Sequence, residues 1–167
     1  GLGCDVSRVT CHQPRDARSA SAEMRLLLVA AAAIIRRQAG VPHVLLAQRP
    51  AGKSLAGLWE FPGGKLEPGE PPEDCLIREL REELGIEVDA SNLVPITFAS
   101  HALDAEKHLL MPLWQVTEFD GEPAGIEGQQ LAWVPAEELS SYAMPEADGP
   151  LVVPVQRAMR ALVDSPN

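Results

Sequence analysis

The sequence predicts a single α/β domain in which a mixed β-sheet carries a helix on each face. With 167 residues, the chain is long enough to bury one substantial core. Short apolar segments with strand character recur along it, and two amphipathic segments with helical spacing lie among them. Strands that frame two helices in this way favour a sheet that is covered on both sides.

The composition restricts the partners that such a domain can have. The formal net charge is −10, which argues against a polynucleotide partner because backbone phosphates bind clustered Lys and Arg. A free nucleotide remains compatible, since a bound metal ion and one or two cationic side chains can neutralise its phosphates. No apolar run is long enough to span a bilayer, so we expect no membrane partner. A monomer is the favoured oligomeric state.

The three cysteines have no spacing typical of a metal site. Cys11-His12 lacks a second ligand pair, and we expect Cys75 to be a small packing residue. Unpaired cysteines fit a reducing cytoplasm, which is the expected location.

Residues 1–23 show neither helical nor strand periodicity, and we expect them to be a disordered extension of a domain that covers residues 24–167. Arginine and serine there suggest a transit peptide, but acidic residues and the lack of an amphipathic pattern argue against it. The apolar run 26–35 imitates a signal peptide. It continues directly into Arg36-Arg37 without a convincing cleavage site, so we interpret it as a buried first strand.

A second strand is expected at residues 44–48, followed by a loop at 50–57 and a short strand at 58–61. Residues 62–65, Pro-Gly-Gly-Lys, then lead toward the first helix. Successive glycines allow a backbone to approach a phosphate group or a metal ion closely.

The first helix is expected to begin near Pro71-Pro72, where proline is tolerated, and to end at Leu84 before a Gly85 cap. Leucines recur every four residues along it and form an apolar stripe for the core. Glu79, Glu82 and Glu83 stand at i, i+3 and i+4, so their carboxylates share a neighbouring face. Such a triplet is ordinarily a solvated acidic face.

Clustered carboxylates repel one another and become favourable when a hard divalent cation binds their oxygens. Mg²⁺ or Mn²⁺ suits this chemistry, whereas zinc prefers His or Cys. Arg78 is spaced to contact Asp74 and Glu82 and to orient the acidic side chains.

Residues 93–101 and 108–117 are expected to be two strands joined by a polar turn at 104–107. Pro112 predicts that the second is an edge strand or carries a bulge. The remaining expected elements are a loop at 119–128, a strand at 130–134, a short helix at 135–140 and an amphipathic helix at 151–163.

The spacing G-x5-E-x7-R-E-L-x-E-E-x-G-I resembles the signature of the Nudix hydrolases. All of its fixed positions are filled: Gly64, Glu70, Arg78, Glu79, Leu80, Glu82, Glu83, Gly85 and Ile86. The resemblance implies an αβα sandwich and the Mg²⁺-dependent cleavage of a pyrophosphate bond in a nucleoside diphosphate linked to another group.

The same resemblance implies roles for individual residues. Glu79, Glu82 and Glu83 match metal-ligand and base positions, with Glu79 either a ligand or the group that orients water. The backbone carbonyl of Gly63 matches a further ligand position. In the loop 121–129, Glu127 matches a fourth acidic group at the metal.

The flanking stretches 47–49 and 59–65 make the chain look closest to the MutT-type nucleoside triphosphate hydrolases. In that pattern Arg49 and Lys65 match phosphate-facing positions, and a guanidinium group suits bidentate phosphate contact. Surface solvation is the alternative for both side chains.

Residues 142–151 resemble the base-recognition loop of these enzymes. In bacterial enzymes that act on 8-oxo-dGTP, the position of Asp148 is often Asn, whereas Asp resembles relatives that hydrolyse CTP or 5-methylated cytidine triphosphates. An ionised Asp148 only accepts hydrogen bonds, from guanine or 8-oxoguanine N–H groups or from the cytosine amino group. Capping of the last helix is its alternative role. Trp59, Leu110, Trp114 and Met144 are possible walls for a base, although such residues are usually core.

The leading hypothesis is therefore hydrolysis of 8-oxo-dGTP to the monophosphate and pyrophosphate, as sanitation of the nucleotide pool. The alternative is a pyrophosphatase for CTP or 5-methyl-(d)CTP. Hydrolysis of ADP-ribose or of a dinucleoside polyphosphate is more remote. A non-catalytic nucleotide sensor is less consistent with a complete glutamate set.

Overall fold

The computed structural model of the protein describes residues 23–165, so the extension expected at residues 1–23 lies outside it, apart from Glu23. The described residues form seven strands, two α-helices and three short 3₁₀ helices. The strands are β1 (Arg25–Gln38), β2 (Val41–Gln48), β3 (Trp59–Glu60), β4 (Gly63–Lys65), β5 (Val94–Ala102), β6 (Lys107–Val116) and β7 (Gln130–Pro135). The helices are α1 (Pro72–Leu84), α2 (Val152–Val163), η1 (Ala90–Asn92), η2 (Ala136–Ser141) and η3 (Glu146–Leu151).

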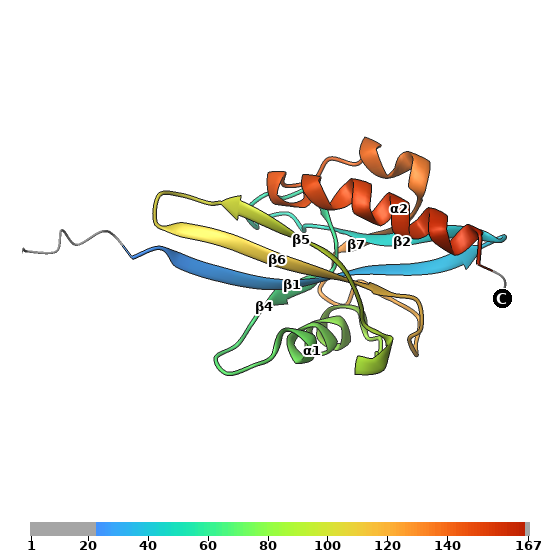
Figure 1. The fold of residues 1–167 in the computed structure, drawn as a ribbon, viewed down its shortest axis with the longest axis horizontal. Coiled ribbons are helices and arrows are strands. Elements are labelled where there is room, and N and C mark those ends of the chain that lie inside the picture. The colour runs from blue at the N-terminus through green and yellow to red at the C-terminus, as the bar shows by residue number, and fades with distance from the viewer. Residues whose placement is uncertain (1–22, 166–167) are drawn as a thin grey trace, which may run out of the picture.

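The strands make one mixed sheet with α1 on one face and α2 on the other (Figure 1). The strand order is β3-β2-β1-β6-β5, with β4 paired to β1 and β7 paired to β2. β1 runs parallel to β6 and antiparallel to β2 and β4. The predicted mixed sheet between two helical layers is confirmed.

β1 is the central strand, and its side chains alternate between two cores. Ala30, Ala32 and Ile34 pack on the α1 side, whereas the residues at 31, 33 and 35 pack on the α2 side. A strand that is buried on both faces needs an uninterrupted apolar run. The run at residues 26–35 is therefore the first strand, as predicted.

α1 has the caps and the apolar stripe that its sequence indicates. Pro72 occupies its first turn, and Gly85 adopts φ 70° while its N–H bonds to the carbonyl of Arg81. Leu80 and the other stripe leucines are fully buried against β1. Cys75 is also fully buried, and burial raises the pKa of its thiol to about 11, which keeps it a neutral packing group.

Three local predictions need correction. β6 lies between β1 and β5, so it is not an edge strand. Pro112, which has no N–H to donate, falls where the pairing with β1 lapses between Leu110 and Leu113. Residues 63–65, expected only to lead toward the first helix, form the short strand β4, and the last helix is preceded by the unpredicted η3. No helix within residues 23–165 is both long and apolar enough to cross a membrane.

Candidate active site

A cavity of about 690 Å³ lies where β4, the end of α1, η3 and the loops beside β2 and β7 come together. Six of the candidate residues line it, although they come from distant parts of the chain: Arg49, Gly63, Lys65, Glu83, Glu127 and Asp148. The fold thus collects two cationic side chains, carboxylates and the candidate base-recognition residue around one space.

Glu79 and Glu82 are not among the residues that line this cavity, but Glu79 lies directly over Gly64, which does line it. A Cβ atom added to Gly64 would be 2.3 Å from the carboxyl carbon of Glu79, so this approach requires glycine. A Cβ atom on Gly63 would instead lie 2.0 Å from the carbonyl oxygen of Ala30 in β1. The two glycines therefore have different tasks, since Gly63 lets β4 pack on β1 and Gly64 makes room for Glu79.

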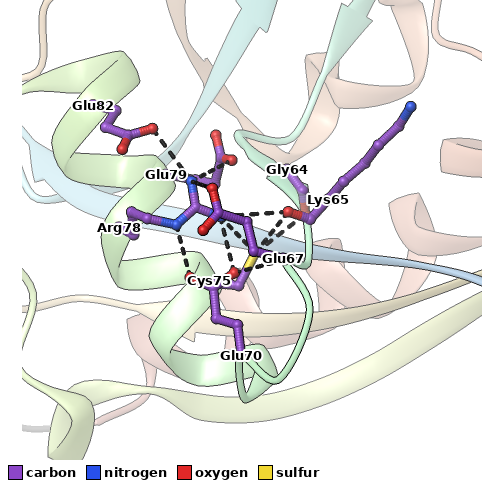
Figure 2. A network of polar contacts seen from close by, with 8 residues as sticks. All are labelled: Gly64, Lys65, Glu67, Glu70, Cys75, Arg78, Glu79 and Glu82. Carbon is purple, nitrogen blue, oxygen red and sulfur yellow. Dashed lines mark hydrogen bonds and ion pairs between the residues drawn. The ribbon is translucent and has the colours of Figure 1, made fainter.

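Arg78 organises the acidic face of α1 (Figure 2). Its Nε and Nη2 atoms donate to the two carboxylate oxygens of Glu70 at 2.7 and 2.9 Å. Its Nη1 atom donates to Glu79 at 2.9 Å and to Glu82 at 3.3 Å. The expected contact with Glu82 is present, but Glu70 takes the place predicted for Asp74. The hydrogen bonds from Arg78 lower the pKa of Glu70 to about 2.

The charged form of the Glu83 side chain is destabilised in the site. Burial raises the pKa of its carboxyl group to about 8, and the charges of Glu79 and Glu127 act in the same direction. Within residues 23–165, no three acidic, His or Cys side chains stand close enough to hold a metal ion without rearrangement. The donors are all carboxylate oxygens, and the repulsion among them is what a hard cation would relieve, so the set fits Mg²⁺ or Mn²⁺.

Arg49 reaches the cavity from the end of β2. Its Nε atom donates to Glu60 at 2.9 Å, and its Nη1 atom donates to the Ser54 carbonyl at 3.1 Å. Lys65 lines the cavity with an exposed side chain. The sequence alone indicates no role for Glu60, which is marked only as a charged residue inside a short apolar strand.

Asp148 is 5% exposed and lies inside η3, on the cavity wall. It does not cap the last helix, because the N-cap of α2 is Leu151 and no side chain bonds there. Burial raises the pKa of Asp148 to about 7; the charge of Glu60 also raises it, whereas Arg49 and the Phe61 backbone N–H lower it.

The structure places the four expected base walls, Trp59, Leu110, Trp114 and Met144, away from the cavity lining. Leu109 and Met111 line it in place of Leu110, because neighbouring residues of a strand point to opposite faces. Trp59 makes an edge-on contact with Tyr142, with ring centroids 5.4 Å apart, and it packs with Met144 against the core on the α2 side. Trp114 belongs to the core on the α1 side.

A mixed sheet between two helices, with a carboxylate-bearing helix beside a cavity of this kind, fits a metal-dependent phosphohydrolase. The family model of the NUDIX domain matches residues 31–153, and the chain belongs to the Nudix hydrolase family. Members of this family generally depend on a divalent metal and act on small nucleotide substrates.

Two curated relatives come from Escherichia coli (strain K12). The chain is 44% identical over 122 residues to a CTP pyrophosphohydrolase, covering 72% of this chain and 85% of that protein. It is 34% identical over 118 residues to an 8-oxo-dGTP diphosphatase, covering 69% of this chain and 87% of that protein.

Two solved structures share the fold. The solution structure of the E. coli ORF135 protein has a TM-score of 0.69 and 38% identity, covering 86% of this chain and 96% of that one. The MutT structure from a study of Aliivibrio salmonicida and Vibrio cholerae has a TM-score of 0.67 and 36% identity, covering 80% and 99%. The predicted αβα Nudix fold is thereby confirmed.

Proposed function

We propose that this protein hydrolyses nucleoside triphosphates to the monophosphate and pyrophosphate with Mg²⁺, and that 8-oxo-dGTP is its principal substrate. Mn²⁺ is a possible substitute for Mg²⁺. The observation that carries the proposal is the cavity lined by two cations, by carboxylates from α1 and the loop before β7, and by a buried acid in η3. This arrangement supports a ligand with a phosphate end and a base end.

The metal ion would be held by oxygens from four residues: Glu82, Glu83, Glu127 and the carbonyl of Gly63. When bound, it neutralises charge on the phosphate oxygens and on the leaving group. Glu79 is either a further ligand or the group that orients the attacking water. Arg78 holds two of these carboxylates in place, which supports catalysis by positioning.

The phosphate chain would be held by Arg49 and Lys65. The guanidinium group of Arg49 is already oriented by Glu60 and by the Ser54 carbonyl, so little side-chain freedom remains to be lost on binding. Lys65 supplies a second, more mobile charge at the cavity wall.

Asp148 would read the base, with Leu109 and Met111 as apolar walls in place of the residues first expected. A buried carboxylate accepts hydrogen bonds from amino or ring N–H groups, which both 8-oxoguanine and cytosine offer. Guanine and cytosine share an exocyclic amino group, whereas thymine has a carbonyl in place of the cytosine amino group, and the ionised form of Asp148 has no proton to donate to that carbonyl. Thymidine triphosphate should therefore be a poor substrate.

A second candidate function is the hydrolysis of CTP or of 5-methyl-(d)CTP. The 44% identity to a CTP pyrophosphohydrolase and the acid at position 148 favour it. A nucleotide-pool role of either kind would belong in the cytoplasm and needs no partner chain.

The experiment is a panel of triphosphates with Mg²⁺ that includes 8-oxo-dGTP, CTP, 5-methyl-dCTP and dTTP, with products separated by chromatography and compared by kcat/KM. We expect monophosphate and pyrophosphate as products, with kcat/KM for dTTP at least about tenfold below the best substrate. Binding of triphosphates without any turnover would contradict the proposal and favour a nucleotide sensor. ADP-ribose and a dinucleoside polyphosphate complete the panel, and cleavage of these alone would also contradict it.

A further inference from the structure

Residues 117–129, which join β6 to β7 and which we call the 117–129 loop, are fastened to the C-terminal end of α1. Such a helix end leaves backbone carbonyls without partners inside the helix. The loop supplies them: the N–H of Ala124 donates to the carbonyl of Leu84 at 3.0 Å, and the N–H of Ile126 donates to that of Glu83 at 3.2 Å. The loop therefore docks on the turn of α1 that carries Glu83.

Gln129 connects this helix turn to Glu127 through a single side chain. Its Nε2 atom donates to the carbonyl of Glu83 at 2.9 Å, and its Oε1 atom accepts from the N–H of Glu127 at 2.9 Å. One amide group thus bonds to the backbones of two residues whose carboxylates face the same cavity. A donor and an acceptor are both needed here, and only an amide side chain of this length supplies the two together.

We propose that Gln129 is a positioning residue, whose amide fixes Glu127 relative to Glu83 so that both carboxylates can share one metal ion. This inference rests on the proposed role of Glu127 as a ligand. Glu127 is otherwise an exposed loop residue, and an untethered loop would lose affinity because its disorder would have to be removed on binding.

The surrounding loop is built to hold the amide in place. A Cβ atom on Gly125 would lie 2.0 Å from the carbonyl oxygen of Gln129, so the backbone at Gly125 is in contact with the backbone at Gln129. The other side-chain anchor, from Arg36 to Glu122, is an exposed ion pair whose Glu122 side chain is 74% exposed. Exposed ion pairs contribute little, so the Gln129 amide is the stronger tether.

The test is a double-mutant cycle on Mn²⁺ binding by the full chain, measured by electron paramagnetic resonance without nucleotide. The variants are Gln129→Met, which keeps the length of the side chain but removes the amide, Glu127→Gln, and the two combined. Gln129→Asn, whose side chain is shorter by one methylene group, is a second way to remove the two amide hydrogen bonds. Gln130→Met is the matched control, because Gln130 is the neighbouring glutamine with an exposed side chain.

We expect Gln129→Met to weaken Mn²⁺ binding by about three- to tenfold in the wild-type background and to have no further effect when Glu127 is already Gln. Gln130→Met should leave binding unchanged, and circular dichroism should show all variants folded. Equal weakening in both backgrounds, no weakening by either Gln129 variant, or no effect of Glu127→Gln would each overturn the inference.

The cycle separates this inference from the proposed function. A wild-type protein that binds Mn²⁺ with the expected coupling but cleaves no triphosphate would refute the proposed substrate and leave the role of Gln129 intact. A protein that cleaves triphosphates but shows additive effects on Mn²⁺ binding would refute the role of Gln129 alone. A protein without measurable Mn²⁺ affinity would refute it too.

Discussion

Arg78 binds the carboxylate of Glu70 through two hydrogen bonds, 2.7 Å from Nε and 2.9 Å from Nη2. Glu70 precedes α1 and is itself oriented by the backbone N–H of Glu67, which donates to it at 2.9 Å. The remaining nitrogen of the guanidinium group contacts Glu79 and Glu82. A residue outside the helix thus fixes the arginine that orders the carboxylates on the helix (Figure 2).

Glu70→Gln should reduce kcat by about tenfold or more while the protein stays folded. The variant replaces a charged, two-point grip on Arg78 by a neutral one, so Arg78 is no longer fixed over Glu79 and Glu82. Steady-state kinetics as a function of Mg²⁺ concentration, together with a melting curve, measure the effect. We expect the Mg²⁺ requirement to rise.

Glu87→Gln is the matched control for this change. Arg81 on the same helix binds Glu87 through two hydrogen bonds of 2.5 and 2.7 Å, but this pair is exposed and lies off the carboxylate cluster. Its removal should leave kcat unchanged. Equal kinetic effects of the two substitutions would show that Glu70 only supports the helix.

Glu82→Gln should give a folded protein with at least about a hundredfold lower turnover. The Glu82 side chain is 56% exposed and does not belong to the apolar stripe of α1, so its loss should not disturb the core. Glu73→Gln, an exposed change on the first turn of the same helix, controls for the loss of one negative charge. Near wild-type release of pyrophosphate by folded Glu82→Gln would remove Glu82 from the metal site.

Substitution of the two adjacent glycines should separate catalysis from stability. Gly64→Ala would drive a methyl group into the Glu79 carboxylate, which can swing aside, so we expect a large loss of kcat with a small change in melting temperature. Gly63→Ala would meet the backbone of Ala30, which cannot move freely, so we expect a large fall in melting temperature. Kinetics and calorimetry on both variants test this. Gly149→Ala, with nothing within 4 Å of the added Cβ, is the control.

The sequence was sufficient to predict β1 and α1 because each has a local pattern that allows one solution. A run such as residues 26–35 can be buried only between two layers, and leucines at every fourth position can face only one core. The signature residues on α1 have helical spacing, so their common face could also be deduced from position alone.

Long-range contacts set the parts of the site that could not be predicted. Glu70 contacts Arg78 from a turn that precedes the helix, so the i, i+4 rule that suggested Asp74 does not describe it. Whether Leu110 or its neighbours Leu109 and Met111 face the cavity depends on the register of β6. The sequence does not fix this register, and a shift by one residue would turn each side chain to the opposite face. Gln129 meets Glu83 across a sequence separation of 46 residues, and no local pattern marks such a pair.

Asp148→Asn should raise stability at alkaline pH and change it little in acid. The folded-state pKa of Asp148 is raised from 3.8 to about 7, so its favourable contribution is complete below pH 3.8 and is lost as pH rises through 7. Asn cannot ionise, and its oxygen can still accept from the Phe61 N–H. We therefore expect the variant to melt several degrees above wild type at pH 8. That difference should vanish near pH 4.

Asp104→Asn is the opposite control, because backbone N–H groups of Glu106 and Lys107 lower the pKa of Asp104. Its contribution to stability is present above its unfolded-state pKa, so this variant should melt below wild type at pH 8 and approach it in strong acid. Calorimetry from strong acid to pH 8 compares the two. If Asp148→Asn and wild type melt at the same temperature at pH 8, the Asp148 carboxylate is hydrated at that pH. Recognition of the nucleotide base by a buried, desolvated Asp148 would then be contradicted.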